Sequence, residues 1–73
     1  MRIGIASPPD RKKLVAEVLY ENEQWAEISQ DLGVFKLEIY PRRNGQPWLF
    51  PLDEALSTLQ VAKERLIGQE TRS

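Results

Sequence analysis

The chain has 73 residues, of which 41% are hydrophobic and 29% charged, and its formal net charge is −1. This length accommodates one domain, and the composition is that of an ordinary folded domain. Neither cysteine nor histidine occurs, which excludes disulfides and argues against a structural zinc site and against thiol or imidazole catalysis. The nearly balanced charge argues against a general nucleic-acid binder, whose affinity comes from neutralising phosphates.

No apolar run reaches the length of a membrane span, and residues 1–10 lack the apolar stretch of a signal peptide. We therefore expect a cytoplasmic protein without a membrane partner. The whole chain, residues 1–73, is predicted to form a single domain.

The first third of the chain predicts two short strands. Ile3 and Ile5 alternate within residues 1–6, and the two prolines that follow end this strand. Residues 14–21 fit a period of two and also a helical period of 3.6, so both structures are open here. Because valine and tyrosine suit a pleated surface, a strand is favoured.

Two clearer strands follow, over residues 24–30 and 34–40, with Gly33 free to adopt a positive φ in the turn between them. One residue of slip would exchange the faces of a strand. The apolar faces match when the first loop holds three residues, 22–24, which would place Val18 beside Ile28.

The C-terminal third predicts an amphipathic helix that begins near Pro51, with acidic residues in its first turn. Gly68 is expected to end the helix, and residues 69–73 should fray. One helical face carries the apolar residues Leu52, Ala55, Leu56, Leu59, Ala62, Leu66 and Ile67. The predicted fold class is α+β: an antiparallel β-meander of three to four strands with this helix packed on one face.

Three carboxylates could lie side by side across the uncovered face of this sheet: Glu17, Glu27 and Glu38. Such a row could in principle serve acid–base chemistry or magnesium binding. An open sheet face does not exclude water, however, and no Gly-rich phosphate loop is present. We therefore expect no enzyme activity, no cofactor and no metal, and interpret the row as solvated or facing a partner.

Aromatic and charged side chains on the same face suggest a surface that binds a protein partner. The predicted binding residues are Glu17, Leu19, Trp25, Glu27, Lys36, Glu38 and Tyr40. Two alternatives remain open for Trp25, which could simply strengthen cross-strand pairing with Tyr40 or be covered by the N-terminal segment.

Residues 23–28, 37–41 and 45–48, followed by the helix from Leu52-Asp53-Glu54-Ala55-Leu56, resemble small bacterial toxin-immunity proteins of the polymorphic-toxin and contact-dependent-inhibition type. These proteins are encoded beside secreted toxins. The strands and the helix start also resemble the antitoxin of HicAB-type modules, although the Asp-Leu-Pro-Gly stretch of that family is missing.

The resemblance implies a non-enzymatic protein-binding module that occludes the active site of a cognate toxin. An acidic sheet face would suit a basic toxin domain, because charge would steer a fast encounter. One alternative function is a homo-oligomeric accessory or structural protein that buries the Trp25 face against a second copy. The other is a nucleic-acid-binding regulator, which would use Arg11, Lys12, Lys13, Arg42 and Arg43.

Overall fold

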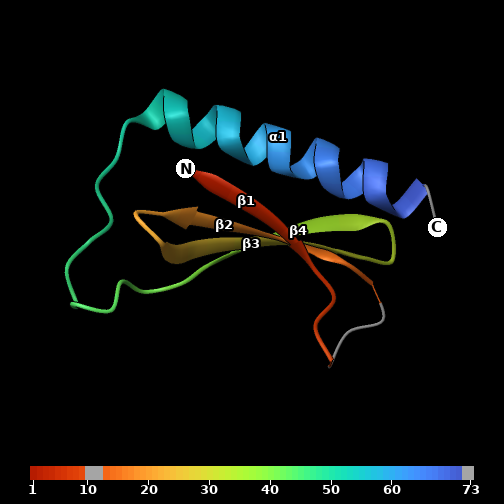
Figure 1. The fold of residues 1–73 in the computed structure, drawn as a ribbon, viewed down its shortest axis with the longest axis horizontal. Coiled ribbons are helices and arrows are strands. Elements are labelled where there is room, and N and C mark those ends of the chain that lie inside the picture. Colours follow the sequence, from red (N-terminus) through yellow and green to blue (C-terminus); the bar gives the residue numbers. More distant parts are fainter. Residues whose placement is uncertain (10–12, 72–73) are drawn as a thin grey trace.

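The computed structural model describes residues 1–9 and 13–71. Within them, four antiparallel strands form one sheet in chain order, and a C-terminal helix lies across one face of that sheet (Figure 1). The elements are β1 (Arg2–Ala6), β2 (Val15–Tyr20), β3 (Glu23–Asp31), β4 (Val34–Ile39) and α1 (Leu52–Thr71). The predicted α+β meander is confirmed, and residues 14–21, which fitted both periods, form a strand.

A β-bulge in β3 sets the register of the first hairpin. The connecting turn holds two residues, Glu21 and Asn22, with φ of 52° and 67°, so the predicted three-residue loop is wrong. Val18 pairs with Ala26, so its predicted pairing with Ile28 is also wrong, and the next residue of β2 pairs with Gln24. Trp25 is therefore an extra residue in β3, and the side-chain alternation is interrupted there.

The second hairpin turns through Leu32 and Gly33, whose φ values are 52° and 80°. Two successive left-handed residues are typical of a tight hairpin turn whose twist matches the strands, and asparagine followed by glycine is its favoured sequence. Gly33 adopts the predicted positive φ. Leu32 adopts the same region with a side chain that is 93% exposed, so it has backbone strain without compensating burial.

Replacing Leu32 with asparagine is expected to raise the free energy of unfolding by about 1 kcal/mol, because asparagine tolerates the left-handed region better than leucine. In a domain of this size the midpoint of thermal unfolding should rise by about 4–8 °C. Leu32→Ala is the control, since it removes the same exposed side chain but keeps the backbone cost. Equal midpoints for both variants would contradict the assignment of strain to this residue.

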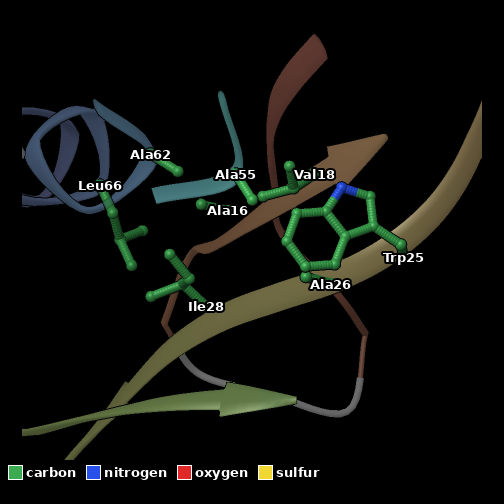
Figure 2. Packing of buried hydrophobic residues seen from close by; sticks show 8 residues of the cluster. All are labelled: Ala16, Val18, Trp25, Ala26, Ile28, Ala55, Ala62 and Leu66. Atoms are coloured by element: carbon green, nitrogen blue, oxygen red, sulfur yellow. The ribbon is translucent and has the colours of Figure 1, made fainter. Parts of the chain in front are cut away.

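The core forms where α1 crosses β1 and β2 (Figure 1). Small side chains at the contact, among them Ala16, Ala55 and Ala62, let the helix approach the sheet closely. Figure 2 shows Leu66 pointing from the helix toward Ile28 of the sheet. The buried apolar cluster consists of Ala16, Val18, Trp25, Ala26, Ile28, Ala55, Ala62 and Leu66.

The helix continues past its predicted end. It runs through Gly68 to Thr71, so the expected termination at Gly68 is wrong. Glycine inside a helix costs about 1 kcal/mol relative to alanine, which the neighbouring helical residues can outweigh. Residues 72 and 73 lie outside the described part of the chain.

The connection between β4 and α1 is anchored by aromatic side chains. The ring centroid of Phe50 lies 4.7 Å from that of Trp25 and 5.2 Å from that of Tyr20. The indole N–H of Trp48 donates a hydrogen bond of 2.8 Å to the carbonyl oxygen of Tyr40. Phe50 and Trp48 therefore close the end of the core.

Candidate protein-binding surfaces

The predicted row of carboxylates exists on the open face, which is the face of the sheet opposite α1. Glu17 pairs directly with Glu27 across β2 and β3, and Glu27 pairs with Glu38 across β3 and β4. Directly opposite residues of antiparallel strands share a face, so the three side chains are neighbours. Glu27 in the middle of the row is buried, with 9% of its surface exposed, so the expected solvated or partner-facing row is wrong at this position. No group of three or more potential ligand side chains able to hold a metal ion occurs among residues 1–9 and 13–71.

The other predicted polar residues of the open face lie beside this row. Lys36 places its ammonium nitrogen 3.4 Å from Oδ2 of Asp31, and the hydroxyl of Tyr40 donates to Oε1 of Glu38 at 3.5 Å. Leu19 is half-buried and pairs with Gln24. Six of the seven predicted binding residues are therefore on or beside the open face.

Trp25 is the exception, and its predicted exposure is wrong. The side chain is 3% exposed and lies in the core beside Val18, Ala26 and Ala55 (Figure 2). The bulge is the physical reason, because the interrupted alternation turns Trp25 and Ala26 to the same side of the sheet. The open face therefore lacks the aromatic anchor that the sequence analysis assigned to it.

The environment of Trp25 is aromatic and apolar. Phe50 packs against the indole, and Ala55 of α1 belongs to the same buried cluster, against which Met1 and Ile3 of the N-terminal segment also pack. The backbone N–H of Tyr40 donates to the carbonyl of Trp25 at 2.9 Å. The indole N–H of Trp25 is buried and has no hydrogen-bond acceptor within the described residues. Burying a donor without an acceptor costs about 1–3 kcal/mol, so this tryptophan stabilises the fold through its ring alone.

A groove of about 720 Å³ lies along the open face near the second hairpin. Its lining includes the cations Lys13 and Lys36 and the anions Asp31 and Glu38. Because both charge signs line the same groove, it does not favour a ligand of one charge.

Two of the five basic residues assigned to a nucleic-acid regulator, Arg42 and Arg43, make contacts within the protein. The guanidinium of Arg42 lies 5.1 Å from the centroid of the Trp48 ring. The backbone N–H of Arg43 donates to Glu23 at 2.7 Å, and its Nε lies 4.0 Å from the same carboxylate. Lys13 is exposed, while Arg11 and Lys12 lie outside the described residues.

A second candidate surface, which the sequence analysis did not predict, lies between α1 and β4. Leu37 and Ile39 of β4 share the helix-side face with their partners Ile28 and Ala26. They nevertheless remain 49% and 59% exposed. On the helix, Leu52 and Leu56 are 70% and 57% exposed. We call these four residues the α1–β4 surface.

Lys63 shows that the helix part of this surface faces β4. Its ammonium nitrogen lies 5.0 Å from the centroid of the Phe35 ring, so this side of α1 is the side next to β4. Leu56 precedes Lys63 by seven residues, which is close to two helical turns. Leu56 therefore lies on the same side of the helix, and Leu52 lies one turn before it.

The width of a helix explains why this surface is uncovered. A helix with its side chains is about 10 Å wide, whereas neighbouring strands are about 4.8 Å apart. One helix therefore covers about two strands, and α1 lies over β1 and β2. The sequence could have predicted an uncovered apolar surface, because one helix cannot bury the whole apolar face of four strands.

Comparison of the chain with known protein families, characterised proteins and solved structures finds no match. Across residues 1–9 and 13–71, no helix combines the length and apolarity that a membrane span requires. The class supported by the fold and these surfaces is a small α+β domain with an uncovered apolar surface.

Proposed function

We propose that the protein is a non-enzymatic protein-binding module and that it binds through the α1–β4 surface. The observation that carries this proposal is the presence of four large apolar side chains, all at least 49% exposed, on the helix-side face of β4 and on the side of α1 next to β4. Scattered exposed apolar residues are normal, whereas a contiguous group is typical of an interaction site. The charged side chain of Lys63 at the edge of the group resembles the polar rim of a protein interface.

The interpretation as an immunity protein depended on an acidic face with Trp25 at its centre. The acidic row supports an encounter with a basic partner, but the aromatic anchor lies in the core. Hot spots of protein interfaces are most often Trp, Tyr or Arg, and the burial of Trp25 removes such an anchor from the open face. An exposed apolar group rimmed by polar residues is the other mark of an interaction site. We therefore place the anchor at the α1–β4 surface. Because Glu27 is buried, only the half-buried Glu17 and the exposed Glu38 of the acidic row are left to steer a partner.

The test is a double variant, Ile39→Thr with Leu56→Gln, which makes the α1–β4 surface polar. Threonine keeps a β-branched residue in the strand and glutamine is a good helix former, so the fold should be retained. We expect association, measured by sedimentation of the pure protein and by affinity capture from cell extract, to weaken about tenfold or more.

Val61→Gln is the matched control on the same helix. Val61 is also exposed and lies five residues from Leu56, which is about 140° around the helix. This control should associate like the unchanged protein. The proposal fails if the unchanged protein neither self-associates nor captures a protein, or if the double variant binds as well as the control.

A further inference from the structure

We propose that the α1–β4 surface binds a second copy of this chain, with β4 pairing antiparallel to β4 of the other copy. This inference rests on the proposed function and names the partner. The two sheets would join into one continuous sheet, and a two-fold axis would pass through Leu37. Three observations on β4 support it: the direction of its backbone groups, the order of its charged residues and the exposure of its apolar residues.

The backbone groups of alternate β4 residues point away from the sheet. The N–H of Tyr40 donates to the carbonyl of Trp25, while Ile39 lies opposite Ala26. In an antiparallel pair this pattern makes Ile39 a non-hydrogen-bonded residue, so its N–H and C=O face the other edge. The same holds for Leu37 and Phe35 by alternation, because β4 pairs with β3 without a register shift. The free edge thus presents a regular template for another strand.

The charges of β4 select one register. Side chains on the same face must meet, so the symmetric possibilities place Lys36, Leu37 or Glu38 on the two-fold axis. The first sets two lysines opposite each other and the last sets two glutamates opposite each other, which is unfavourable. With Leu37 on the axis, Lys36 of each copy meets Glu38 of the other copy. Lys36 contacts Asp31 only in an exposed pair, so its ammonium group can reach this partner.

The apolar residues agree with the same register. On the helix side, Leu37 would meet Leu37 of the second copy, and Phe35 would meet Ile39. Leu52 and Leu56 of both helices would flank this row, since α1 lies on the same face. A two-fold axis brings the same surface from both copies together, so one group of exposed apolar residues is sufficient.

The other edge of the sheet is less suited to pairing. β1 has five residues with Gly4 at its centre, and glycine weakens a strand. Its apolar side chains Ile3 and Ile5 already pack against the core. A strand added at β1 would therefore gain backbone hydrogen bonds without burying exposed apolar side chains.

The test uses charge reversal at the two residues that meet across the axis. Lys36→Glu places two pairs of glutamates together, and Glu38→Lys places two pairs of lysines together. Each variant is expected to raise the Kd of the dimer about tenfold or more, because both symmetry-related pairs change at once. Sedimentation between about 10 μM and about 1 mM covers the affinity expected of a small interface. Circular dichroism verifies that each variant is folded.

Two ways of combining the charge reversals make the test specific to this register. The double variant, Lys36→Glu with Glu38→Lys, restores opposite charges and should dimerise like the unchanged protein. An equimolar mixture of the two single variants should form a heterodimer, because all cross-axis pairs are then opposite. In the unchanged protein, amide exchange of Leu37 should slow as protein concentration rises.

Several results would overturn the inference. They are an unchanged protein that stays monomeric to about 1 mM, single variants that dimerise normally, or a mixture that does not associate. If the chain is monomeric but captures a different protein in a manner sensitive to Ile39→Thr with Leu56→Gln, the proposed function stands and this inference fails. If it captures nothing and is monomeric, both fail.

Discussion

Replacing Trp25 with alanine is expected to lower the free energy of unfolding by about 3–5 kcal/mol. The indole is buried beneath α1 and contacts Phe50, which anchors the connection between β4 and the helix. Removing the ring leaves a cavity and also releases that connection. Because small domains are marginally stable, much of the variant should be unfolded at room temperature. Urea denaturation followed by far-ultraviolet circular dichroism measures the loss.

Trp25→Phe separates the ring from its N–H group. Phenylalanine retains aromatic packing against Phe50 and removes a donor that has no acceptor within the described residues. The smaller ring leaves a small cavity, while the removed donor recovers part of its desolvation penalty of about 1–3 kcal/mol. The net loss should be about 1 kcal/mol or less. A loss as large as that of Trp25→Ala would show that the N–H group has a stabilising partner.

Leu66→Ala is expected to cost about 2–5 kcal/mol. Leu66 is fully buried on α1 and points toward Ile28 (Figure 2). It is the largest fully buried side chain of the described residues, so its removal leaves a cavity between the helix and the sheet. The same urea titration measures the change in the free energy of unfolding.

Leu49→Ala provides the matched control for Leu66→Ala. It removes the same atoms from a side chain that is almost fully exposed, and surface substitutions usually stay within about 0.5 kcal/mol. The difference between the two variants therefore isolates the contribution of burial. Similar losses for both would contradict the placement of the core between α1 and β2.

Sequence periodicity predicted most of the architecture, and the strand preference of valine and tyrosine decided residues 14–21. Alternation through Phe35, Leu37 and Ile39, and a helical stripe through Ala55, Ala62 and Leu66, were sufficient to predict a meander covered by a helix. Face matching also predicted an odd number of residues between the first two paired faces. The structure has that extra residue, although Val18 pairs with Ala26 and not with the predicted Ile28. Such patterns are visible because they depend only on which side chains leave water.

The placement of that extra residue could not be predicted in the same way. The extra residue was predicted in the loop, whereas the structure has a two-residue turn and a bulge at Trp25. Both solutions keep Val18 and Ala26 on the same face, so apolar patterning does not distinguish them. The bulge buries an indole that the loop solution would expose. The position of the extra residue therefore decides whether Trp25 lies on the surface, as predicted, or in the core, as the structure shows.

The periodicity of the sequence also did not predict how much of the sheet the helix covers. Leu56 and Ile67 belong to the predicted apolar stripe but remain exposed, because the helix lies over β1 and β2. Periodicity identifies a face that avoids water, and it does not identify which neighbour covers that face. The folding of a single chain gives no reason for apolar residues of the helix to remain exposed. Binding of a partner would give such a reason.

The two tryptophans lie in contrasting surroundings, which gives the molecule two built-in optical probes. Trp25 is enclosed by apolar and aromatic groups and lacks a hydrogen-bond partner within the described residues, so its fluorescence should be blue-shifted. Trp48 is half-buried, donates to a carbonyl and lies beneath a guanidinium, so its emission should be closer to that of an indole in contact with water. A change in the longer-wavelength emission of Trp48 would then report loosening of the segment between β4 and α1. A change in the shorter-wavelength emission of Trp25 would report unfolding of the core.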